Sequence, residues 1–291
     1  MNGSDQGRGV VLALSLVAAA ASIVATVSVA LAHRQGPARC PEGLAGEGPR
    51  CCGLGQHFAG GRCTGHPTRC ATTQTVTSQA CVAPPERVAY AGGKALLGSP
   101  DWQAHEARGL GAATVAPFEL DAFEVTLERW EACRSASACM PAPFSGEPGE
   151  PVRGVTPSQA EAFCRFAGGR LPTGAEWVLA AMGREARRFA WGSTGLVCRR
   201  AAYGLVKGPC AVGATGPELT GARPDGATPE GVFDLSGNVA EWTHEARGYL
   251  ARGGSFRATN AGELKNWTAE ATDARPDIGF RCAYPTKGST R

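Results

Sequence analysis

The sequence predicts a loop-rich domain of the α+β class, preceded by an apolar segment and a small cysteine-rich segment. The chain has 291 residues, of which 40 are Gly and 20 are Pro, and only 19% are charged. That composition is typical of a globular body with many turns and argues against a helical bundle. Short runs of alternating apolar residues and a few well-marked helix starts indicate brief strands and brief helices in one domain.

The first 32 residues predict a membrane helix behind a short tail. Residues 1–9 form the tail, and residues 10–32 carry no charge and exceed the roughly 20 residues that a helix needs to cross a bilayer. A cleavable signal peptide is the alternative, because Ala30-Leu31-Ala32 reads as a small-residue cleavage site. The length of the apolar run favours a retained anchor, whereas cleavage would make the protein secreted.

The cysteines indicate the compartment of the remaining chain. All 12 follow the apolar segment, as expected for a chain that meets an oxidising environment. We therefore place residues 33–291 outside the cytoplasm, in the periplasm or at the cell surface. The net charge of +3 is spread over the whole length without a basic patch, so the sequence indicates no nucleic-acid partner.

Residues 33–87 predict a stalk rich in Cys, Pro and Gly, with little material for a core. Such a segment needs cross-links to offset its chain entropy. Disulfides are favoured over a zinc site that would use His57 and His66, because the stalk has no Cys-x-x-Cys pair. Six cysteines allow fifteen pairings, so the connectivity stays open. The six are Cys40, Cys51, Cys52, Cys63, Cys70 and Cys81.

From residue 88 the pattern becomes that of a folded domain, which we expect to extend to residue 291. Alternating apolar residues predict strands near residues 88–97 and 118–125. Thr126 then opens a short helix in which Leu127 and Trp130 share a face. The loop behind this helix lies between two cysteines, and we expect a local disulfide between Cys133 and Cys139.

Two further helix starts carry capping boxes. One is Thr156-Pro157-Ser158-Gln159, in which Pro fits the first helical position and Gln can bond back to the cap. The other is Thr173-Gly174-Ala175-Glu176. Gly168-Gly169 and Gly183 predict the ends of the two helices. The inward stripe of the first helix consists of Ala160, Phe163, Cys164 and Ala167.

The stretch between Trp191-Gly192 and Phe233 shows little periodicity of either kind and is rich in turn residues. A long segment of this type is either disordered or a binding loop held by cross-links and ions. Cys198 and Cys210 favour the second interpretation, with a disulfide inside the loop.

Several short motifs follow one another through the second half of the domain. The most specific are Arg252-Gly253-Gly254-Ser255-Phe256, the run from Gly231 to Trp242, and Gly279-Phe280-Arg281-Cys282. A single motif would mean little, but the series in this order and spacing resembles the formylglycine-generating enzyme family, also called sulfatase-modifying factors. The resemblance implies a compact C-type-lectin-like fold with short strands and helices and much irregular chain.

The resemblance also implies a structural disulfide between Cys164 and Cys282. A bridge that closes so long a loop would stabilise the fold by about 4–5 kcal/mol in the chain-entropy model. Two buried free thiols are the alternative.

A calcium site is a further implication of the resemblance. Its ligands would be the carboxylates of Asp234 and Glu241 and the main-chain carbonyls of Gly237 and Val239, which are the hard oxygens that calcium takes. A tight Gly237-Asn238 turn without a metal, with Asp234 as a cap and Glu241 in solvent, is the alternative. The family's second calcium site has no matching ligands in this sequence.

The reactive centre departs from the family pattern. Members that oxidise sulfatases carry two redox cysteines after the Arg-Gly-Gly-Ser stretch, and those positions are Ala258 and Glu263 here. A methyl group and a carboxylate cannot hold a soft copper ion or form a disulfide with a substrate. Ser255 is retained, and Ala240 replaces an aromatic residue. We therefore expect no copper and no catalytic residue at this centre.

Two functions from different classes follow. The first is a catalytically inactive binding module, anchored through residues 10–32, that presents its loops to an unidentified protein, peptide or glycan. The second is an extracytoplasmic metal-dependent oxidoreductase with an altered site, as in the non-haem iron enzymes grouped with the family. Its candidate ligands show no facial-triad spacing, which favours the binding module. These candidates are His105, His244, Glu245 and Glu263.

Overall fold

The computed structural model describes residues 44–47, 50–59, 62–69, 75–76, 81–82, 86–97, 111–195, 198–266, 269–270 and 272–286. Within these ranges no helix is both long enough and apolar enough to span a bilayer. The predicted membrane segment, residues 10–32, lies outside the described residues, and so does His105.

Small antiparallel hairpins make up the described part of the stalk. Cys52 and Cys63 form a disulfide that is fully buried, so these two thiols are not available to a zinc site. The side chains of the other four stalk cysteines lie outside the described part. The hairpins pair β1 (Leu44–Glu47) with β2 (Arg50–Gly53), β3 (His57–Ala59) with β4 (Arg62–Thr64), and β5 (Thr75–Val76) with β6 (Cys81–Val82).

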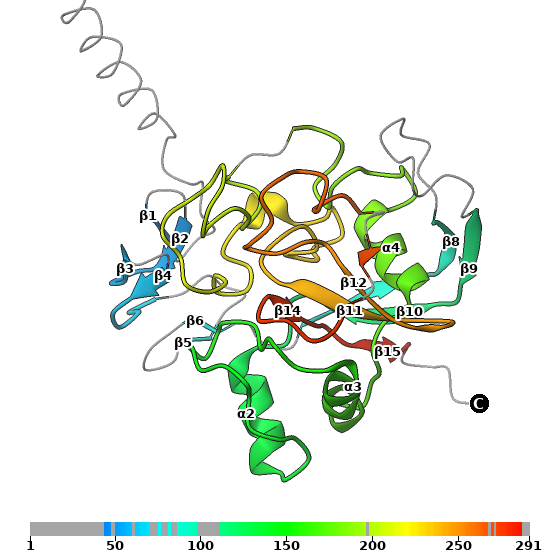
Figure 1. Ribbon diagram of the computed structural model, residues 1–291, viewed down its shortest axis with the longest axis horizontal. Coiled ribbons are helices and arrows are strands. Elements are labelled where there is room, and N and C mark those ends of the chain that lie inside the picture. Colours follow the sequence, from blue (N-terminus) through cyan, green and yellow to red (C-terminus); the bar gives the residue numbers. More distant parts are fainter. Residues whose placement is uncertain are drawn as a thin grey trace, which may run out of the picture. The chain divides into compact units, whose positions relative to one another are not determined.

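Two sheets and one hairpin form the β part of the main domain (Figure 1). The antiparallel three-stranded sheet has the order β15 (Ala283–Pro285), β10 (Phe118–Asp121), β7 (Arg87–Tyr90). The four-stranded sheet has the order β13 (Ala269–Glu270), β12 (Gly248–Arg252), β11 (Ala240–Glu245), β14 (Ile278–Gly279), and its β11–β14 pair is parallel. The separate hairpin consists of β8 (Gly93–Leu96) and β9 (Ala112–Val115).

The predicted strands are present but shorter than the alternating pattern indicates. The strand predicted at residues 118–125 ends at Asp121, because the following amides bond outside the ladder: Ala122 N donates to Glu86 O, and Val125 N donates to Phe280 O. Phe123 and Val125 are nevertheless buried. The apolar pattern of this segment therefore reports burial correctly and overstates the length of the strand.

Three short α-helices begin where the capping residues predict. They are α2 (Leu127–Ser135), α3 (Pro157–Phe166) and α4 (Gly174–Met182), and a 3₁₀ turn, η2, covers Pro224–Gly226. Thr126, Thr156 and Thr173 each accept a hydrogen bond on Oγ1 from the backbone N–H three residues on, and the last two complete capping boxes. Gly168 and Gly183 lie at positive φ just beyond α3 and α4, which confirms the predicted helix ends.

The core is built around three fully buried tryptophans, Trp130, Trp177 and Trp242. Each indole N–H has an acceptor 2.9 Å away: Met140 O, Glu241 Oε2 and Val155 O respectively. Helix α4 packs on β8, β9 and β11, whereas α2 and α3 contact each other (Figure 1). The N–H group of each of these three indoles is therefore hydrogen-bonded inside the core.

Disulfides close the main domain at three places. Cys164 of α3 is bonded to Cys282 across 118 residues, with the two Cα atoms 5.5 Å apart, and both residues are fully buried. Two shorter loops are closed by Cys133–Cys139 and Cys198–Cys210. All three bonds join cysteines for which the sequence predicts a bridge.

Candidate functional site

The loop that follows β12 carries the motif residues. Gly253 and Gly254 have φ angles of 89° and 66°, which favour glycine. A Cβ at either position would also lie 2.7 Å from a backbone oxygen, that of Leu235 for Gly253 and that of Glu263 for Gly254. The two glycines therefore let the loop pack directly on neighbouring backbone and place Ser255 below the surface.

Ser255 is buried and engaged in a local hydrogen-bond network. Its Oγ donates to Asp277 Oδ2 at 2.7 Å and accepts from Arg257 N at 3.2 Å. The other oxygen of Asp277, Oδ1, lies 3.3 Å from Arg275 Nε. The retained serine thus holds the loop to the segment before β14.

Ala258 is enclosed in an apolar cluster. Its exposed fraction is 2%, and the same cluster contains Tyr203, Leu205, Phe256 and Leu264. The segment from Cys198 to Cys210 packs against this loop through one backbone hydrogen bond, from Leu205 N to Phe256 O at 2.9 Å, and Leu205 lies in the same apolar cluster as Ala258. A side chain at position 258 would therefore be surrounded by apolar groups.

Glu263 lies on the surface and holds its own turn. Its Oε1 accepts from Asn260 Nδ2 at 2.6 Å and from Thr259 N at 3.1 Å. The two positions that carry thiols in the oxidases thus hold a buried methyl group and an exposed carboxylate. Within the described residues no group of three His, Cys, Asp or Glu side chains is arranged to hold a metal ion.

The run from Gly231 to Trp242 contains two buried acidic residues, Asp234 and Glu241, and Glu241 forms an ion pair. Glu241 accepts from Arg281 Nη2 at 2.6 Å, from Arg281 Nε at 2.7 Å and from Trp177 Nε1 at 2.9 Å. Arg281 is 0% exposed and Glu241 is 1% exposed. Glu241 is therefore a neutralised core residue, which differs from the expectation that it lies in solvent when no metal is bound.

Asp234 and Glu124 lie in the same cluster without a cation of their own. Asp234 Oδ2 accepts from Gly221 N at 2.6 Å, and Glu124 accepts from Asn238 Nδ2 at 2.6 Å and Val239 N at 3.0 Å. Burial raises the pKa of Asp234 to about 6, with repulsion from Glu218 and Glu241 adding to the rise. Burial, and then repulsion from Asp234 and Glu241, raises the pKa of Glu124 well above its usual value.

The cluster contains more acidic than basic groups. Glu218 is paired with the buried Arg223 at 2.6 Å, and Glu241 is paired with Arg281. Asp234 and Glu124 have no ion pair of their own and share only the longer-range attraction of Arg281. A cation near Asp234 would relieve this surplus. Of the predicted calcium ligands, Asp234 fits such a cation. Glu241 is already neutralised by its ion pair with Arg281, so it needs no further cation.

Of the described residues considered for acid–base or iron chemistry, His244 and Glu245 line one cavity, whereas Glu263 lies elsewhere. The His244 ring lies 5.4 Å from the Tyr249 ring, and Glu245 is paired with Arg252 at 2.8 Å. Glu263 belongs to the separate surface turn described above. The described residues therefore contain no facial triad from this set.

Several residues that organise the site are absent from the sequence prediction. Asp277 binds Ser255 of the loop after β12. Glu124 accepts a hydrogen bond from Val239 N, and Arg281 donates to Glu241. Arg281 lies inside one of the motifs that mark the resemblance, and this is the only signal that points to it. The partners of these three residues lie far away in sequence, so spacing does not reveal the pairs.

Comparisons with protein families place most of the chain in one family. Residues 73–285 match the profile described as "Sulfatase-modifying factor enzyme 1-like domain". The chain is 31% identical over 209 residues to the formylglycine-generating enzyme of Streptomyces coelicolor, which covers 60% of this chain and 63% of that protein. It is 40% identical over 101 residues to the hercynine oxygenase of Mycolicibacterium thermoresistibile, which covers 33% of this chain and 21% of that protein. The chain thus spans less than two thirds of these relatives.

Solved structures share the fold at low sequence identity. PvdO from Pseudomonas aeruginosa superposes with a TM-score of 0.55 at 19% identity, over 68% of this chain and 94% of that chain. Treponema denticola variable protein 1 superposes with a TM-score of 0.54 at 21% identity, over 68% and 94%.

Proposed function

Because this chain belongs to the sulfatase-modifying factor family, with its formylglycine-generating enzymes, we propose that it is a catalytically inactive member. In this proposal it is a binding module with the family's C-type-lectin-like fold, displayed outside the cytoplasm by a membrane helix. The family's oxidases need two thiols that face a common copper ion and a substrate. The enclosure of Ala258 in the apolar cluster, with Glu263 turned to its own surface loop, is the observation that carries the proposal.

Besides the two missing thiols, the surroundings of position 258 are unsuited to the oxidase reaction. Copper binding and substrate attack both require an accessible thiolate. At position 258 a thiol would be buried among Phe256, Leu205 and Leu264, and burial in apolar surroundings raises a thiol pKa. Restoring one cysteine would therefore leave the surrounding pocket closed.

The oxidising location and the anchor have separate support. Four disulfides occur among the described residues, and bonds of this kind persist in oxidising compartments. The uncharged run at residues 10–32 supplies the proposed anchor. Intact-mass measurement of the native protein tests retention of the anchor, since a mass that lacks residues 1–32 would contradict it.

We also propose a calcium site centred on Asp234. The main-chain carbonyls of Gly237 and Val239 would complete it with water, and Glu241 would remain in its ion pair with Arg281. The surplus of buried negative charge at Asp234 and Glu124 supports this site.

Metal analysis of the purified full-length chain tests both proposals. Calcium without stoichiometric copper or iron is the expected result. Stoichiometric copper or iron would instead favour an oxidoreductase with an altered site, the second function considered from the sequence. A chain that retains no calcium after equilibration with excess Ca²⁺ would contradict the calcium site alone.

A further inference from the structure

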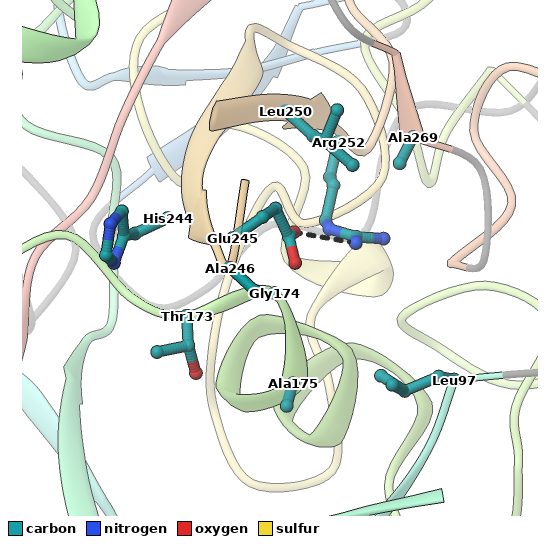
Figure 2. Close-up of a pocket in the computed structure, with 10 residues that line it drawn as sticks. All are labelled: Leu97, Thr173, Gly174, Ala175, His244, Glu245, Ala246, Leu250, Arg252 and Ala269. Carbon is teal, nitrogen blue, oxygen red and sulfur yellow. Dashed lines mark hydrogen bonds and ion pairs between the residues drawn. The ribbon is translucent and has the colours of Figure 1, made fainter. Parts of the chain in front are cut away.

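A cavity of about 560 Å³ opens between the N-terminus of α4 and the β11–β12 hairpin (Figure 2). Small-molecule sites usually have volumes of roughly 300–1,000 Å³. Ser255, Ala258 and Glu263 are not among the residues that line it. The cavity is therefore distinct from the family's reactive centre, and what it binds does not depend on whether the domain is catalytic.

An ion pair lies in the wall of this cavity. Arg252 Nη2 donates to Glu245 Oε1 at 2.8 Å. Thr243 Oγ1 lies 3.0 Å from the same oxygen and 3.1 Å from Leu250 O, and its one proton can serve either acceptor. Arg252 Nε donates to Thr243 Oγ1 at 3.3 Å. The Arg252 side chain is only 9% exposed, and Figure 2 shows the two charged groups meeting in the middle of the view.

Gly174, the first residue of α4, permits a close approach of the Glu245 carboxylate to the helix. A Cβ at this position would lie 2.5 Å from Glu245 Oε2 and 2.6 Å from its carboxyl carbon. The missing side chain lets the carboxylate lie against the first turn of the helix, where negative charge is favoured. Together with Arg252 and Thr243, the helix fixes the orientation of Glu245.

The pair leaves one donor and one acceptor unused. Arg252 Nη1 and Glu245 Oε2 have no hydrogen-bond partner among the described residues. Around them the lining is apolar, with Leu97, Ala175, Leu250 and Ala269. The Glu245 side chain is 28% exposed, so water reaches the carboxylate in the free protein. A ligand that displaces this water has to satisfy both groups, because a polar group left unpaired in a desolvated site is costly.

We propose that this cavity binds a neutral carboxamide carried on a small apolar body. The amide carbonyl would accept from Arg252 Nη1, and the amide NH₂ would donate to Glu245 Oε2. A carboxylate would be repelled by Glu245, and an ammonium group would be repelled by Arg252. The apolar part of the ligand would pack on Leu97 and Leu250.

Three probes with one apolar body test the proposal by ligand-observed NMR with the full-length chain. They are 4-methylpentanamide, 4-methylpentanoate and 4-methylpentan-1-amine, which are neutral, anionic and cationic at pH 7. We expect saturable binding of the amide in the millimolar range, at least about tenfold tighter than that of either charged probe. Absence of amide binding, or equal binding of all three probes, would overturn the proposal.

A filling substitution locates the site. Ala269→Phe, directly opposite Arg252 in the β12–β13 pair, places a ring in the cavity, and we expect it to weaken amide binding by at least about tenfold. Ala132→Phe, at an exposed position of α2, is the matched control and should leave binding unchanged. Circular dichroism and urea titration establish that both variants are folded. Unchanged binding by folded Ala269→Phe would show that the amide binds elsewhere.

Discussion

Replacement of Arg281 by methionine should be among the most destabilising single changes in the domain. The guanidinium is fully buried and donates to both oxygens of Glu241, to the carbonyls of Asp121 and Ala122, and to Phe233 O. Its removal leaves the Glu241 carboxylate buried with no cation. Breaking a buried pair in this way costs about 3–5 kcal/mol.

A cost of this size is a large share of the free energy of unfolding, which is only about 5–15 kcal/mol for a typical domain. If the free energy of unfolding falls by about 2–3 kcal/mol per molar of urea, the midpoint of urea unfolding should fall by about 1–2 M. Tryptophan fluorescence follows the transition, since Trp177 donates to the same carboxylate. Arg165→Met is the matched control: its pair with Glu161 lies on the surface of α3, and its loss should cost less than about 1 kcal/mol.

A double variant separates charge burial from packing. If the unpaired carboxylate is the cause, Glu241→Met combined with Arg281→Met should recover most of the lost stability. A double variant whose cost equals the sum of the two single costs would refute this reasoning. So would an Arg281→Met protein that unfolds at the midpoint of the unsubstituted chain.

Three further predictions concern the disulfide, the acidic cluster and the enclosed position. Cys164→Ser should lower the free energy of unfolding by about 4–5 kcal/mol through the loss of its 118-residue bridge, as measured by urea titration; an unchanged midpoint would contradict it. The pKa of Asp234 is raised in the folded state from 3.8 to about 6, so the folded state binds more protons in that window and stability should fall by about 2–3 kcal/mol as pH rises through it. Asp234→Asn should flatten this part of the profile, and added Ca²⁺ should raise the melting temperature of the unsubstituted chain only; a profile that Asp234→Asn leaves unchanged would count against it. The thiol of Ala258→Cys should react with iodoacetamide only in urea, whereas that of Glu263→Cys should react at once; equal rates without urea would show that position 258 is open.

Local features of the fold could be predicted because their partners lie close together in sequence. Thr173 and Glu176 are three residues apart, so a capping box is readable from the chain alone. The same holds for the end of α3 at Gly168. The Cys164–Cys282 bond spans 118 residues, and only the family resemblance indicated it.

The chemistry of the site depends on contacts that no local pattern contains. The sequence shows that position 258 carries no thiol. That the position is enclosed depends on Leu205 and its neighbours in the Cys198–Cys210 segment, which lie more than forty residues earlier. The ion pair of Glu241 with Arg281 likewise joins residues 40 positions apart. Sequence reasoning therefore found what is missing from the reactive centre and could not find what closes it.

The central claim is that this domain has lost the family's oxidase activity, and direct assay of that reaction tests it. The full-length chain is incubated with copper(I), oxygen and a cysteine-containing sulfatase peptide, and the peptide is analysed by mass spectrometry. A formylglycine-generating enzyme under the same conditions is the positive control. We predict that the cysteine is recovered unchanged, whereas formation of an aldehyde that a copper chelator abolishes would contradict the account.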